Sequence, residues 1–176
     1  MSVIDLPRPA SRPDRSASGQ WSEPVSPSRP TKAAPLAEVL ASRAEQLRRL
    51  VVDLQDEVVP SRREGLFVAL RAAVQAYTHA LEVVCYQRLI RSGGAGASAC
   101  REGSVYHDLI ATVLDHLHHG REKSGALWSA RLQVLRDLLD LQVERDLSRT
   151  VALLGAVLPP AELLQVRDEF VSVSAP

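Results

Sequence analysis

Two polar residues, Gln142 and Asp146, continue an apolar helix stripe and are therefore predicted to lie inside the protein. The stripe starts with Leu132, Leu135 and Leu139 and advances in steps of three and four residues, the spacing of one helix face. An unpaired amide in a protein interior costs about 1–3 kcal/mol, and an unpaired carboxylate costs more. We therefore expect these two side chains to belong to a buried polar site or to the remnant of one.

Two further polar side chains interrupt the apolar stripes of other predicted helices near their middle. They are Tyr77 and His107. In an antiparallel bundle, mid-helix residues from different helices can meet, and Tyr77, His107, Gln142 and Asp146 together supply both hydrogen-bond donors and acceptors. For His107 and Asp146 we favour a hydrogen-bonded role in the core over a role as working metal ligands.

A second group of potential metal ligands, Asp115, His116, His118 and His119, follows in the same predicted helix as His107. A surface site for a transition metal could form there. We favour the alternative that histidines gather at a helix C-terminus because the helix dipole stabilises positive charge there.

Other polar residues near the predicted layer are assigned to solvent. His79 and Glu82, three residues apart, are rejected as an alternative pair of metal ligands, because His79 flanks the polar face of its helix and Glu82 lies on that face. Glu144 and Arg145 are expected to be solvated. The sequence contains no nucleophilic-serine motif, no phosphate-binding glycine loop after a strand and no Cys-x-x-Cys pair.

Apolar spacing predicts five helices, of which four are long. The expected boundaries are residues 36–58 for the first, an opening capping box at Ser61–Glu64 for the second, an end at Gly120 for the third, 123–154 for the fourth and 159–170 for the fifth. No useful stretch alternates with a period of two. We therefore expect an all-α fold, an up-down-up-down four-helix bundle with a short C-terminal helix.

The run 92–98, rich in glycine, is expected to be a flexible connection between the second and third helices. Tyr86 is expected to pack beneath it. Cys85 falls on a helix and Cys100 in or beside the connection, and two cysteines are too few for a disulfide framework. A reduced pair is favoured, and a single disulfide stays open. Trp128 is expected to anchor one end of the core.

Residues 1–35 are expected to be a disordered tail, and residues 36–176 the single helical domain. The tail holds seven of the eleven prolines, mixed with serine and arginine, and buries too little apolar surface to offset its ordering entropy. Trp21 could dock on a partner, although a solvated tryptophan is the favoured interpretation.

The bulk composition excludes several classes of partner. Lys and Arg total 21 and so do Asp and Glu, so net charge does not favour nucleic acid or an anionic membrane. No apolar run approaches the roughly 20 residues of a membrane span, and no apolar signal segment opens the chain. We expect a cytoplasmic protein without nucleic-acid or membrane partners. An unidentified protein partner and a homodimer both stay open.

Three stretches of the sequence carry a family resemblance. They are Leu70–Tyr77 continuing to Leu81, Glu82 and Tyr86; Tyr106–Ile110; and Gln142–Asp146 followed by Leu158–Leu164. In these stretches, and over roughly residues 36–171, the chain resembles the hemerythrin-like (HHE cation-binding) four-helix bundles. The resemblance implies a di-iron centre held by histidines and carboxylates from all four helices.

The chain departs from this ligand pattern at most positions. His107 and Asp146 match it, whereas other residues stand where the family has histidine or glutamate. These substituted positions are Ala44, Tyr77, Leu81 and Gln142. Two remaining ligands cannot hold two irons in a closed core, because each iron needs several nitrogen or oxygen donors.

The expected function rests on these departures. We expect a degenerate hemerythrin-like protein that acts as a non-catalytic interaction or structural module, with no cofactor and no enzymatic activity. The alternative is a remodelled core site that binds a metal, haem or a small molecule. In that case iron at His107 and Asp146, beside Tyr77 and Gln142, is the metal site that the resemblance implies.

Overall fold

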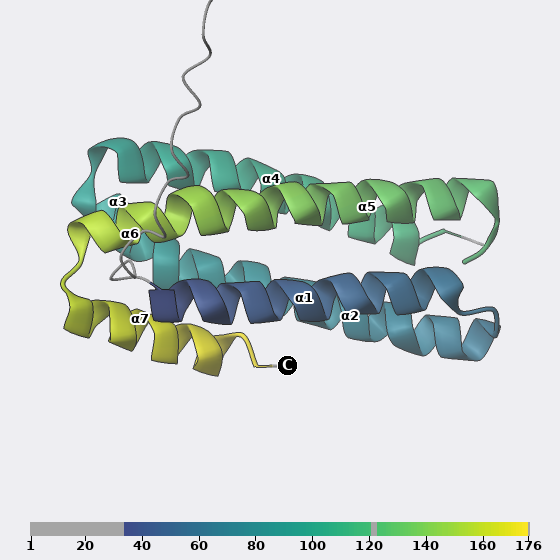
Figure 1. The fold of residues 1–176 in the computed structure, drawn as a ribbon. Helices are drawn as coiled ribbons and strands as arrows, with labels where there is room; N and C mark the ends of the chain where they lie inside the picture. The colour runs from purple at the N-terminus through teal and green to yellow at the C-terminus, as the bar shows by residue number, and fades with distance from the viewer. Residues whose placement is uncertain (1–33, 121–122, 176) are drawn as a thin grey trace, which may run out of the picture.

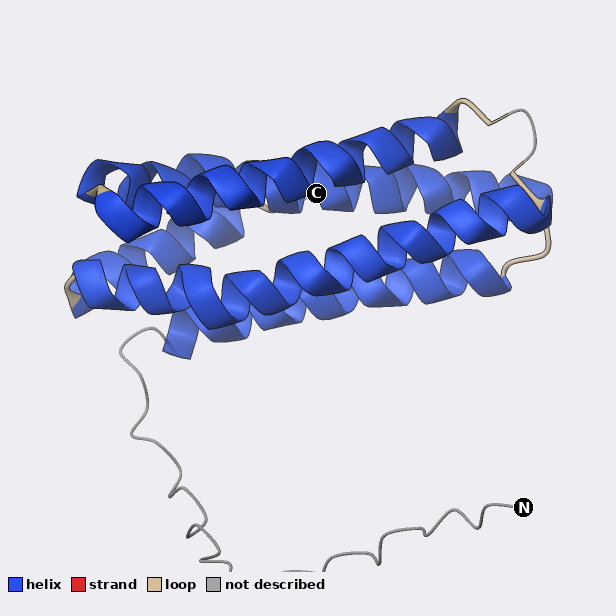
Figure 2. Cartoon of the chain, turned by 90° about the horizontal axis from the view of Figure 1, so that it is seen from above, coloured by secondary structure: helices blue, strands red, loops and turns tan. Residues whose placement is uncertain are grey.

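The computed structural model describes residues 34–120 and 123–175, and every regular element among them is a helix. Figure 2 shows this helical architecture from above. The predicted all-α class is confirmed for this part of the chain. The prediction of disorder for the tail falls on residues 1–33, outside the described residues, whereas Ala34 and Pro35 belong to the first helix. Proline is tolerated there because the first turn of a helix does not need its N–H groups.

The described chain forms five continuous helical rods, two of which contain a π-helical segment. The rods are α1 (Ala34–Asp56); α2 (Pro60–Ala80) with η1 (Leu81–Tyr86) and α3 (Gln87–Ser92); α4 (Gly94–His118); α5 (Gly125–Arg145) with η2 (Asp146–Thr150) and α6 (Val151–Val157); and α7 (Pro160–Val173).

The four long rods lie side by side, and consecutive rods run in opposite directions (Figure 1). α1 packs against α2 and α5, and α4 packs against α5. α7 lies on the outside against α1, α2 and η1, where it buries Leu163, Val166 and Phe170. The core is formed by the apolar stripe of each rod, as the 3/4 spacing predicts.

The connection between the second and third rods differs from its prediction. A single residue, Gly93, separates α3 from α4, with φ +72° and ψ −167°, a conformation that only glycine adopts readily. The helix restarts at Gly94, directly after this turn. Gly96 lets the two helices pack closely here, since a Cβ at this position would lie 2.6 Å from the carbonyl oxygen of Leu89. The expectation of a flexible connection over 92–98 was therefore wrong. Cys100 consequently lies buried inside α4 rather than in a loop.

Two further predictions about helix ends and anchors have clear outcomes. The capping box at Ser61 is not formed, because Val59 is the N-cap and Pro60 occupies the first helical turn without a side-chain cap. Proline is favoured there because its fixed φ suits the helix. Trp128 is buried as expected, with the Arg63 guanidinium 5.6 Å above its ring.

Within residues 34–120 and 123–175, no helix has both the length and the apolar character that crossing a bilayer requires.

Candidate functional site

Both π-helical segments lie at one group of buried polar side chains. Tyr86 is the last residue of η1, and Asp146 is the first residue of η2. A π-turn widens the helix and changes which residues face inward, and such turns are frequent at functional sites. The segments therefore mark this part of the core as the candidate site.

Asp146 is the centre of the group and is fully buried. One of its carboxylate oxygens accepts hydrogen bonds from the Tyr77 hydroxyl at 3.2 Å and from the Gln142 amide nitrogen at 2.9 Å. The other oxygen accepts a hydrogen bond from the Thr150 hydroxyl at 3.2 Å and lies 3.9 Å from the Arg145 guanidinium. Protein donors thus surround the carboxylate on both oxygens.

Tyr86 and Arg145 form a second shared contact beside Asp146. The Tyr86 hydroxyl accepts from the Gln142 amide at 3.2 Å and from the Arg145 guanidinium at 3.4 Å, and Arg145 also donates to the Ala99 carbonyl. The expectation that Arg145 is solvated was wrong, since its side chain is only 12% exposed. Its length lets the guanidinium reach inward and offset the buried carboxylate.

Gly103 makes room for this contact. A Cβ at this position would lie 2.1 Å from the Tyr86 hydroxyl oxygen and 2.6 Å from an Arg145 guanidinium nitrogen. Glycine therefore lets α4 approach the hydroxyl and the guanidinium without displacing either.

His107 belongs to the same region but hydrogen-bonds elsewhere. Its Nδ1 is 2.7 Å from a carboxylate oxygen of Glu82, and its ring stacks on the Tyr86 ring at a centroid distance of 5.6 Å and an angle of 9°. Of the four predicted residues, Tyr77, Gln142 and Asp146 are hydrogen-bonded together, and His107 is linked to them through Tyr86. The assignment of Glu82 to solvent alone was wrong, because its half-exposed carboxylate reaches back to the imidazole. His79 is exposed, which confirms its rejection.

The electrostatics of the group are set by burial. Burial raises the pKa of the Asp146 carboxyl to about 6, although the Gln142 hydrogen bond and the nearby His107 and Arg145 act in the opposite direction. Burial is also the largest cause that raises the pKa of the Tyr77 and Tyr86 hydroxyls, and the Asp146 charge adds to it. Both phenols are therefore protonated at neutral pH and able to donate hydrogen bonds.

The two cysteines lie close to this region as free, buried thiols, and burial raises the pKa of both. The Cys100 thiol contacts the carbonyl oxygen of Tyr86 at 3.6 Å. A raised pKa keeps the thiol protonated, and the protonated form is a poor nucleophile and metal ligand.

Three buried polar atoms in this region have no hydrogen-bond partner among the described residues: Nε2 of His107, Oε1 of Gln142 and Nε of Arg145. Buried polar atoms are normally partnered, so each calls for an explanation such as a bound water or ligand.

The residues present do not fit a di-iron centre. Ala44 and Leu81 are buried and have no donor atoms, and the Asp146 oxygens already accept bonds from protein donors. Among residues 34–120 and 123–175, no group of three or more His, Cys, Asp or Glu side chains is placed to hold a metal ion.

The histidines near the end of α4 make protein contacts of their own. The His118 ring stacks on Phe67 at 6.2 Å, and Nδ1 of His119 lies 2.9 Å from the carbonyl oxygen of Asp115. These contacts agree with the interpretation, favoured from the sequence over a surface metal site, that the histidines gather there because it is a helix C-terminus.

The sequence reasoning missed Thr150, Tyr86 and Glu82 as members of the region. Thr150 had a signal, since it lies four residues after Asp146 on the stripe that already carries Gln142. Tyr86 and Glu82 had none, because the π-helical turn of η1 alters the spacing on which the assignment rested.

Comparisons with protein-family models, with curated proteins and with solved structures found no match. The family resemblance therefore stays a prediction.

Proposed function

We propose that this chain is a non-catalytic helical module, related to the hemerythrin-like bundles, that serves as an interaction or structural domain. In this proposal a hydrogen-bonded cluster centred on Asp146 replaces the ancestral di-iron centre. The observation that carries the proposal is the state of Asp146, whose two carboxylate oxygens accept hydrogen bonds from Tyr77, Gln142 and Thr150.

The chemistry of the neighbouring side chains supports this proposal. A metal would have to displace the Tyr77, Gln142 and Thr150 donors from Asp146, and each displaced donor would lose a buried hydrogen bond worth about 1 kcal/mol or more. Gln142 presents its amide nitrogen, which is not a ligand atom, to the carboxylate. The imidazole of His107 is oriented by Glu82 rather than by the cluster.

Elemental analysis tests the proposal directly. We expect the full chain, purified from cells supplied with iron and zinc, to carry neither metal in a stoichiometric amount. The Asp146→Ala variant should give the same result, and the absorption spectrum of the unmodified chain should lack oxo-bridged iron and haem bands. Near-stoichiometric metal that disappears in Asp146→Ala would contradict the proposal.

A second candidate function is a remodelled binding site for a small polar ligand, a single metal ion or haem. The three unpartnered atoms of His107, Gln142 and Arg145 favour it, because a bound molecule could supply their missing partners. Binding to the folded state raises the melting temperature. A saturable rise with Zn²⁺, Fe²⁺ or haem that is lost in Gln142→Ala, and kept in the surface control Gln133→Ala, would favour this candidate over the first.

A further inference from the structure

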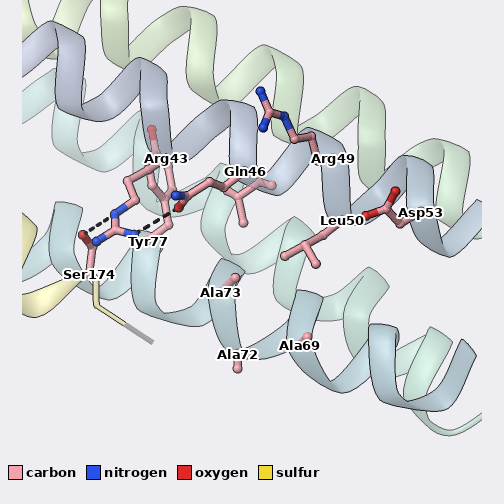
Figure 3. Close-up of a pocket in the computed structure, with 11 residues that line it drawn as sticks. Arg43, Gln46, Arg49, Leu50, Asp53, Ala69, Ala72, Ala73, Tyr77 and Ser174 are labelled. Carbon is pink, nitrogen blue, oxygen red and sulfur yellow. Dashed lines mark hydrogen bonds between the residues drawn. The ribbon is translucent and has the colours of Figure 1, made fainter. Parts of the chain in front are cut away.

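A groove of about 500 Å³ runs between α1 and α2 on the outer face of the bundle (Figure 3). Leu47 and Leu50 of α1 and the alanines 69, 72 and 73 of α2 contribute its apolar surface. The alanine side chains are too short to fill the space between the two helices. The groove therefore exposes apolar surface that a larger side chain could cover.

This groove continues the surface on which α7 lies. Tyr77 and Ser174 line one end of it. There the Tyr77 ring makes a T-shaped contact with Phe170 of α7, with centroids 5.9 Å apart, and Arg43 donates a hydrogen bond to the Ser174 hydroxyl at 3.2 Å. Apart from Ser174, every residue that lines the groove belongs to α1 or α2. The apolar side chains of α7 show what kind of group this face accepts.

The chain itself contains a segment that can reach the groove. Residues 1–33 precede Ala34, which starts α1, and α1 is one wall of the groove. Along α1, at about 1.5 Å per residue, Arg43 lies about 14 Å from Ala34 and Asp53 lies about 28 Å away. Trp21 precedes Ala34 by thirteen residues, which span up to about 43 Å when extended.

The chemistry of this segment matches the groove. Trp21 is the only aromatic residue among the first 33 and offers a large flat apolar group for the alanine-lined surface. Glu23 follows it two residues later. Arg43 lines the groove and hydrogen-bonds only the neutral side chains of Ser174 and Gln46, whereas Arg49 is already paired with Glu45 at 3.1 Å.

We propose that the Trp21 side chain docks in this groove, with Glu23 close to Arg43. The docking does not rest on the proposed function. Tyr77 contributes to both places, since its side chain lines one end of the groove and its hydroxyl donates to Asp146 inside the bundle, but the test below changes only the groove surface.

Fluorescence of a full chain with one tryptophan tests the docking. In the Trp128→Phe variant, Trp21 is the only tryptophan, and we expect its emission to be shifted to shorter wavelength than in the denatured chain. We also expect its quenching by acrylamide to be several-fold weaker. Adding Ala72→Glu, which places a charge in the groove, should abolish both effects, whereas Ala130→Glu on the exposed face of α5 should leave them unchanged.

A second measurement covers the case in which Trp128→Phe disturbs the fold. In the otherwise unmodified chain, the indole N–H resonance of Trp21 should shift on Ala72→Glu and stay in place on Ala130→Glu. Three results would overturn the proposal: a Trp21 emission equal to that of the denatured chain, protection that survives Ala72→Glu, or protection that disappears on dilution together with a change from dimer to monomer mass.

Discussion

Asp146 shows how one residue can be tolerated where the sequence pattern calls for leucine. Transfer of a carboxylate from water into a core is costly, and its net cost depends on the bonds that replace hydration. Here Tyr77, Gln142 and Thr150 supply donors and Arg145 supplies positive charge nearby. These neighbours thus offset the cost of burying the carboxylate, and the removal of any one of them should measurably lower the free energy of unfolding.

Tyr77→Phe removes one donor to Asp146 without changing the shape of the side chain. We expect the free energy of unfolding at neutral pH to fall by about 1–2 kcal/mol, because the buried carboxylate loses a hydrogen bond. Urea unfolding measures the change. Tyr106→Phe is the matched control, since the Tyr106 hydroxyl has no hydrogen-bond partner among the described residues, and it should be close to neutral. Equal effects of the two variants would show that the Tyr77 hydroxyl does not stabilise the cluster.

Gly103→Ala tests the close approach of α4 to Tyr86 and Arg145. The added Cβ cannot be accommodated at 2.1 Å from the hydroxyl oxygen, so we expect a loss of about 1–3 kcal/mol in the free energy of unfolding. Part of this loss should be recovered in the Gly103→Ala, Tyr86→Phe double variant, because the nearest clashing atom is then absent. Additive losses in a thermal or urea double-mutant cycle would argue against direct contact.

At the scale of the helices, the sequence predicts those features that obey a regular 3.6-residue period. The five rods, the apolar stripe of each and the inward direction of Tyr77, Gln142 and Asp146 all obey that period. Tyr86 does not. It lies nine residues after Tyr77, which is about two and a half turns of an α-helix and would place it on the opposite face. η1 begins after Tyr77 and ends at Tyr86, and its wider turn brings both hydroxyls to the Gln142–Asp146 pair.

The prediction of a flexible connection at the junction of α3 and α4 was wrong for a different reason, because it rested on local composition. Glycine and serine over 92–98 resemble a linker, but tertiary packing outweighs their low helix propensity, as the close contact of Gly96 with Leu89 shows. Composition alone cannot separate a glycine that gives flexibility from one that permits close packing.

Gly93→Ala distinguishes a required turn from a flexible linker. We expect this substitution to lower the free energy of unfolding by about 1–3 kcal/mol, because alanine is strained at φ +72°, ψ −167° although no atom obstructs its Cβ. Gly65→Ala is the control. It lies exposed within α2 with open space around it, and it should raise the free energy of unfolding by up to about 1 kcal/mol. A neutral Gly93→Ala in chemical denaturation would restore the linker interpretation.

At the scale of the whole molecule, the raised pKa of Asp146 links folding to pH. The folded state binds the proton of this carboxyl more tightly than the unfolded state does, since its pKa is about 6 in the fold against an ordinary 3.8. The protonated carboxyl therefore favours folding below about pH 4, and this contribution is lost as the pH rises through 6. From the difference between the two values, the contribution is on the order of 3 kcal/mol.

Asp146→Asn isolates this contribution from all other titrating groups. The amide nitrogen of the new asparagine needs a hydrogen-bond acceptor. The side-chain carbonyl oxygen of Gln142, which has no partner in the unmodified chain, can accept this bond if the Gln142 amide group rotates by half a turn. We therefore expect the variant to fold. Its free energy of unfolding, minus that of the unmodified chain, should increase by about 3 kcal/mol from about pH 4 to pH 7, because only the unmodified chain loses the contribution of the protonated carboxyl. Urea unfolding at several pH values measures it. A difference independent of pH would mean that Asp146 titrates near its ordinary pKa in the folded protein, so that water, and not protein donors alone, solvates the carboxylate.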